Sequence, residues 1–154
     1  MGSSYWKFNR NNHHVDNFRF FLMKNPPYKA KHLHDRTWVF GKPFDVFKYG
    51  KVVPHIQFGK YAYEHKSYYG HPIDSSTLCR NTGVFVLNGP LFENDIVSDE
   101  TNKWIVEYFP QNCCFALRSV SNNKVKEFSA LACTGSGNGK ITFTDLVKVG
   151  NKFD

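Results

Sequence analysis

The sequence lacks the features that mark zinc ribbons, thioredoxin-like enzymes and membrane-spanning helices. It contains four cysteines, Cys79, Cys113, Cys114 and Cys133, and no two of them form a C-x-x-C pair. No stretch approaches the run of about 18 apolar residues that a membrane-spanning helix needs. The N-terminus also has no apolar segment typical of a secretory signal. We therefore expect a cytoplasmic protein with reduced thiols and no membrane contact.

Complete motifs for nucleotide binding or nucleophilic catalysis are also missing. The segment GSGNGK at 135–140 ends in Gly-Lys, but a phosphate-binding P-loop would need glycine at Thr134 and a hydroxyl residue at Ile141. A nucleophile elbow around Ser136 would need glycines at Thr134 and Asn138. A hairpin loop is the better interpretation of this segment.

Three smaller groups of reactive side chains also favour structural roles. His32 and His34 would share one side of an extended chain, but no further ligands follow at metal-site spacing, so a solvent-facing loop is favoured over a metal site. Cys113 and Cys114 have no histidine and asparagine partners in a recognisable arrangement, and burial is the default for such residues. Glu93 and Asp95 fit the start of a strand, where Asp caps a turn. We expect no catalytic site, no bound metal and no cofactor.

What the chain does contain points to a single β-rich domain. Its 154 residues can build one core, and aromatic residues, which favour strands, make up 17% of it. The formal net charge of +7 permits contact with nucleic acid or with an acidic protein and does not choose between them. The cationic residues are scattered, which argues against a dedicated basic arm.

Turn residues divide the chain into short expected strands with little helix. Residues 28–36 are basic and histidine-rich and suggest a loop, and Gly41–Pro43 is expected to stop a strand that begins at Thr37. Hairpins are expected at Gly50 and at Asn88–Gly89, because Asn-Gly holds the backbone of a tight turn. Further strands are expected at 84–87, 103–109, 114–118 and 141–144.

Lysine, arginine and tyrosine alternate within one third of the chain. Aromatic faces stack on single-stranded bases while cations neutralise phosphate, although the same residues also cover ordinary sheet faces and protein interfaces. The candidate binding residues are Lys48, Lys51, Lys60, Tyr61, Tyr63, Lys66, Tyr68, Tyr69 and Arg80.

Over residues 37–154 the sequence resembles the YopX family of small phage and prophage proteins. The family carries a pattern close to D-x-x-T, T-G, N-G and (F/Y)-E-G-D-I-V, and ends near V-x-G-N-x-(F/Y)-(D/E), with W-V-x-G upstream. The matching residues are Trp38, Val39, Gly41, Asp74, Thr77, Thr82, Gly83, Asn88, Gly89, Phe92, Glu93, Asp95, Ile96, Val97, Val149, Gly150, Asn151, Phe153 and Asp154.

Three positions depart from the family pattern. Val86 stands where the family usually has Asp, and Pro90 lies in a segment that is one residue shorter. Asn94 replaces the glycine before Asp-Ile-Val, and asparagine can also adopt left-handed φ. The matched residues are turn formers and core residues, so they look like fold determinants.

The resemblance implies a mostly β fold, an SH3-like or partly open β-barrel or meander, over residues 37–154, with residues 1–36 as an N-terminal arm and lead-in segment. It also implies a phage-encoded, non-enzymatic binding protein without an active site. We expect it to act on a host protein, as an inhibitor of a host defence system of the anti-CRISPR type would. The alternative is a nucleic-acid-binding protein that uses the basic-aromatic residues on DNA or RNA. Exposed sheet edges would favour a homo-oligomer.

Overall fold

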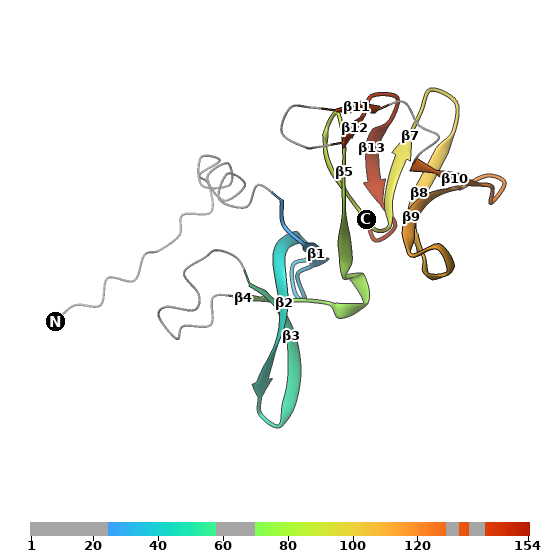
Figure 1. The fold of residues 1–154 in the computed structure, drawn as a ribbon. Helices are drawn as coiled ribbons and strands as arrows, with labels where there is room; N and C mark the ends of the chain where they lie inside the picture. The colour runs from blue at the N-terminus through green and yellow to red at the C-terminus, as the bar shows by residue number, and fades with distance from the viewer. Residues whose placement is uncertain (1–24, 58–69, 129–132, 136–140) are drawn as a thin grey trace.

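The computed structural model describes residues 25–57, 70–128, 133–135 and 141–154 (Figure 1). The expected mostly β fold with little helix is confirmed. In the described part of the chain the strands form two sheets, and neither sheet closes into a barrel. Short 3-10 helices, among them η2 (Ser75–Thr77) and η3 (Pro110–Asn112), interrupt the strands. None of the helices in this part is long and apolar enough to cross a membrane.

The first sheet has eight strands and the second has five. In spatial order, the first sheet contains β11 (Cys133–Gly135), β12 (Ile141–Phe143), β5 (Cys79–Val86), β1 (Tyr28–Lys31), β2 (Trp38–Lys48), β3 (Lys51–Gln57) and β4 (Gly70–Pro72), and β6 (Gly89–Phe92) also pairs with β5. The second sheet contains β10 (Val125–Glu127), β9 (Cys114–Ser119), β8 (Lys103–Phe109), β7 (Asp95–Ser98) and β13 (Val147–Asn151).

The main core lies where strands of the two sheets face each other. It consists of Val86, Leu91, Val97, Val106, Leu117, Phe143 and Leu146. A smaller cluster of Ala30, Ile56 and Ile73 lies beneath the part of the first sheet around β1 and β3. The β2–β3 hairpin extends away from the five-stranded sheet (Figure 1).

Two expectations about the first part of the chain were wrong. Tyr28–Lys31 is not a loop, because it forms β1, which pairs with β2 on one side and with β5 on the other. Gly41–Pro43 does not stop a strand either, because β2 continues through it to Lys48. A side chain at Gly41 would lie 1.8 Å from the carbonyl oxygen of Gln57 on β3, so glycine permits this close pairing.

Both expected hairpins form, but the second one turns one residue earlier. The first turns at Tyr49 and Gly50, which both have positive φ, as a type I′ turn requires. The second turns at Leu87 and Asn88, and Gly89 already pairs with Val86. The strands expected at 103–109 and 114–118 correspond to β8 and β9, and the one expected at 141–144 corresponds to β12.

Candidate functional site

The hairpin tip, defined as residues 47–52, is the most exposed apolar feature among the described residues. Phe47 is 74% exposed, Tyr49 is fully exposed and Val52 is 59% exposed. Phe47 pairs with Val52 across the hairpin, and Lys48 pairs with Lys51. Because side chains alternate along a strand, Phe47 and Val52 share one face while the two lysines lie on the other. The tip therefore presents an apolar pair on one face and two cations on the opposite face.

The backbone edges of this hairpin are poorly suited to pairing with a further strand. Its two-residue turn makes Lys48–Lys51 a hydrogen-bonded pair, and such pairs alternate with non-hydrogen-bonded ones. By this alternation Pro43 and Pro54 fall in non-hydrogen-bonded pairs, so their nitrogens point outward. Each proline removes a donor from one outer edge, which weakens edge pairing.

The candidate binding residues of the sequence do not all come together in the described structure. Lys48 and Lys51 lie at the hairpin tip. The residues Lys60, Tyr61, Tyr63, Lys66, Tyr68 and Tyr69 lie outside the described residues. Sequence reasoning missed Phe47 and Val52, although the alternation of β2 and β3 around Gly50 places them on one face.

Arg80 on β5 makes its side-chain contacts with other residues of the chain. Its Nε and Nη2 atoms donate to the two carboxylate oxygens of Glu93, at 2.9 and 3.0 Å. The hydrogen bond to Glu93 raises the pKa of Arg80, and its guanidinium stacks 4.2 Å from the ring centre of Tyr108. Two open hollows of about 370 and 580 Å³ flank the neighbouring Phe115. The second hollow is lined by Cys114 and Glu127, among other residues.

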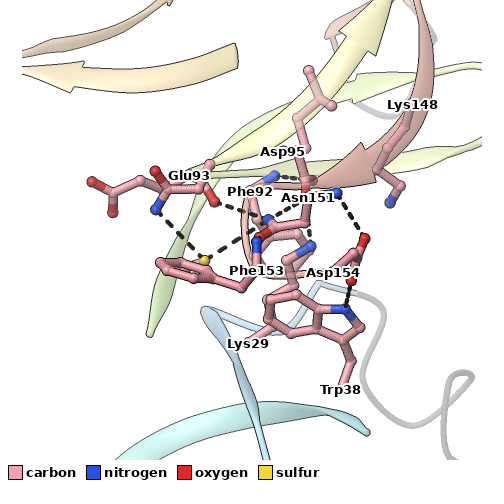
Figure 2. A network of polar contacts seen from close by, with 12 residues as sticks. Lys29, Trp38, Phe92, Glu93, Asp95, Lys148, Asn151, Phe153 and Asp154 are labelled. Atoms are coloured by element: carbon pink, nitrogen blue, oxygen red, sulfur yellow. Dashed lines mark hydrogen bonds and ion pairs between the residues drawn. The ribbon is translucent and has the colours of Figure 1, made fainter. Parts of the chain in front are cut away.

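A buried polar cluster joins the two sheets and is the arrangement that most resembles a catalytic centre (Figure 2). Lys29 on β1 forms an ion pair with Asp95 on β7, and Asp95 is completely buried. Asp95 also accepts a hydrogen bond from the side chain of Asn151 at 2.9 Å and one from the backbone N–H of Phe92 at 2.8 Å. The ammonium of Lys29 lies 4.3 Å from the ring centre of Trp38. The two charges are thus paired, and both oxygens of the Asp95 carboxylate accept hydrogen bonds.

The thiol of Cys79 lies within this cluster but is not activated. Burial raises its pKa, which keeps it protonated at neutral pH. It donates to the carbonyl of Thr77 at 3.2 Å, and the Asn94 and Asn151 amides approach its sulfur at 3.9 and 4.0 Å. Cys79 has no exposed surface, so a substrate has no access to it.

Asp154 extends the cluster toward the surface. Its Oδ1 accepts hydrogen bonds from Trp38 Nε1 at 2.8 Å and from Lys31 Nζ at 3.0 Å, and its Oδ2 accepts one from the Asn151 N–H at 2.7 Å. Burial opposes ionisation of Asp154, but the hydrogen bonds from Trp38 and Lys31 outweigh it, and the pKa of Asp154 lies below its usual value. Residues of the family-like pattern thus meet in the buried polar cluster between the sheets, namely Trp38, Asp95, Asn151 and Asp154.

Sequence reasoning did not identify Lys29 and Lys31 as members of this buried polar cluster. They lie two residues apart on β1 and therefore on one face, and this Lys-Ala-Lys alternation was the available signal. His32 contacts the rings of His34 and His71 edge-on, with ring centres 5.7 and 5.4 Å away. Among the described residues no three His, Cys, Asp or Glu side chains are placed to hold a metal ion.

Comparison with known proteins gives no match. No family model, no curated protein and no solved structure matches the chain. The relationship to the YopX family therefore stays a prediction from the sequence pattern.

Proposed function

We propose that this chain is a non-enzymatic binding protein whose hairpin tip docks on an acidic surface of another protein. The exposure of Phe47, Tyr49 and Val52 at the end of one extended hairpin carries this proposal. Aromatic residues are enriched at the centres of protein interfaces, where burial against a partner supplies much of the binding energy. The buried polar cluster, in contrast, is closed to substrates.

Charge supports an acidic partner. Lys48 and Lys51 flank the apolar side chains of the tip, and the chain as a whole has a formal charge of +7. A partner with carboxylates around an apolar depression would bury Phe47 while its rim attracts the two lysines. Such complementarity speeds association and selects the orientation of binding.

The resemblance to the YopX family supports a phage-encoded protein with a bacterial host protein as its target. A component of a host defence system, the target class of an anti-CRISPR type inhibitor, is the partner we favour within that group. Blocking such a component requires only binding.

Nucleic acid is the second candidate partner because of one observation at the same tip. Tyr49 is fully exposed between Lys48 and Lys51. A tyrosine ring between two cations can stack on an unpaired base while the lysines contact phosphates. Binding of this kind would weaken steeply with salt.

Recovery of bacterial proteins by purified variants tests the proposal. The Phe47→Ser/Tyr49→Ser variant removes the tip, and Leu87→Ser is the matched control because Leu87 is also an exposed turn residue, at 68%. We expect the wild-type chain and the control to retain the same partner after nuclease treatment and the tip variant to lose it. Equal recovery by both variants would exclude the tip as the docking site. Loss of the partner on nuclease treatment would favour nucleic acid.

A further inference from the structure

The outer face of the five-stranded sheet presents aliphatic side chains. Val97, Val106 and Leu117 point into the core, so their neighbours along β7, β8 and β9 point outward. Ile96 pairs with Ile105, Ile105 pairs with Arg118, and Arg118 pairs with Val125. These side chains therefore form one row across β7, β8, β9 and β10.

Val125 ends this row on β10. At the other edge Ile96 pairs with Gly150, and the exposed Val147 lies on the same face of β13, opposite Ser98. Val125 is also exposed, and Ile96 and Ile105 are half-buried. Exposed aliphatic side chains that gather on one face of a small protein point to an interaction site. Two sheets that pack face to face use such β-branched side chains for their contact.

The charges on this face are balanced, unlike those of the whole chain. Lys103 and Glu107 lie on the outward side of β8, and Arg118 and Glu127 lie on the outward side of β9 and β10. Arg118 Nε donates to Glu107 Oε2 at 2.8 Å. The face thus has two cations and two anions, while the chain has an excess of seven positive charges. It can approach a second copy of itself without the repulsion that the rest of the surface would create.

We propose that two copies of this chain associate through the outer faces of their five-stranded sheets. A two-fold axis along the middle strand, β8, lays β13 of one copy over β10 of the other. The β13 edge with Val147 then faces the β10 edge with Val125 of the second copy, and the same contact forms twice, as a closed dimer requires.

The β13 edge of this sheet is poorly suited to pairing with a further strand. Asn88 reaches the outer edge of β13, where its Nδ2 donates to the carbonyl of Lys148 at 2.8 Å. The N–H of Lys148 donates to Asn88 Oδ1 at 3.0 Å. The asparagine side chain therefore occupies the backbone groups that an added strand would need.

Light scattering on purified full-length chains tests the dimer. We expect the wild-type chain to have twice its monomer mass of 17.8 kDa, and Val147→Lys and Val125→Lys each to reduce the mass to that of the monomer at the same concentration. Leu33→Lys, at an exposed residue between β1 and β2 of the first sheet, should leave the dimer intact. Far-UV circular dichroism and thermal unfolding confirm that each variant is folded.

Two results would overturn this proposal. One is a monomeric wild-type chain over the full concentration range, and the other is a dimer that both valine variants retain. The hairpin variant Phe47→Ser/Tyr49→Ser should remain dimeric, so a failure of the dimer and a failure of partner docking are told apart. A dimer lost only in the hairpin variant would place self-association at the hairpin tip.

Discussion

The ammonium group of Lys29 on β1 and the carboxylate of Asp95 on β7 form an ion pair in the interior, between strands that belong to different sheets. Lys29 is 5% exposed and Asp95 is not exposed at all. Sixty-six residues separate them along the chain. The pair therefore fixes how the first sheet meets the second, with aromatic rings of Trp38 and Phe92 beside the ammonium.

Asp95→Ala should lower the free energy of unfolding by about 3–5 kcal/mol, because the buried ammonium of Lys29 then has no carboxylate. It also leaves the N–H of Phe92 without its acceptor. Urea unfolding of the variant and the wild-type chain measures the difference. Glu107→Ala is the control, since it breaks a half-exposed pair with Arg118 and should cost about 1 kcal/mol or less. Equal losses in the two variants would contradict a special role for the buried pair.

Asn94 has a φ of 65° in the turn between β6 and β7. Asn94→Ala should destabilise the protein by about 1 kcal/mol. A residue with a Cβ atom but no polar side chain is unfavourable in left-handed backbone. Asn94→Gly is the matched variant, and glycine adopts this conformation without strain. We expect its midpoint of thermal unfolding to equal or exceed that of the wild-type chain. An alanine variant as stable as the glycine variant would show that the backbone at Asn94 is not left-handed.

Asp154 makes stability depend on pH at the acidic end. Its pKa lies below the usual value of 3.8, so its stabilising contacts are fully present above that value and are lost as pH falls through the lower folded value. Asp154→Asn should therefore destabilise the protein at neutral pH by about 1 kcal/mol or less, since nearly half of the side chain is exposed and screened. The gap between variant and wild type should close in acid. Urea unfolding at a series of pH values measures this gap, and a gap that is constant below pH 4 would argue against the contribution of Asp154.

The cysteines should differ sharply in reactivity. Cys113 is exposed, whereas Cys79 is buried and its pKa is raised by burial. Iodoacetamide should label Cys113 in the native protein and should label Cys79 only after unfolding, because the thiolate is the reactive form. Peptide mass spectrometry of native and unfolded samples separates the two sites. Labelling of Cys79 in the native protein at the rate of Cys113 would mean that the buried polar cluster between the sheets opens readily to solvent.

The elements that could be predicted from the sequence are those with local causes. The strand at Lys103–Phe109 is bounded by Pro110, and the first hairpin turn contains Gly50. The left-handed backbone of Asn94 also follows from its residue type. In each case the signal lies within a few residues, so no knowledge of distant contacts was needed.

Where distant contacts decide, the local signal gave the wrong answer or none. Tyr28–Lys31 looks like part of a basic loop, yet Lys29 and Lys31 reach buried or half-buried carboxylates on Asp95 and Asp154. The turn of the second hairpin lies at Leu87 and Asn88, and the Asn88 side chain pairs with the backbone of Lys148. The side chains of Lys29, Lys31 and Asn88 all contact residues that lie sixty or more positions away along the chain.

The sequence by itself determined a β-rich chain, the places of several strands and one of the turns, because alternation and turn residues act locally. Only the tertiary structure decided which polar residues are buried and which aromatic residues are exposed. It closed the Cys79 and Asp95 region to solvent and left Phe47, Tyr49 and Val52 at the end of a hairpin. Burial depends on which strands pack together, and strand order across two sheets is set by the whole chain rather than by any one segment.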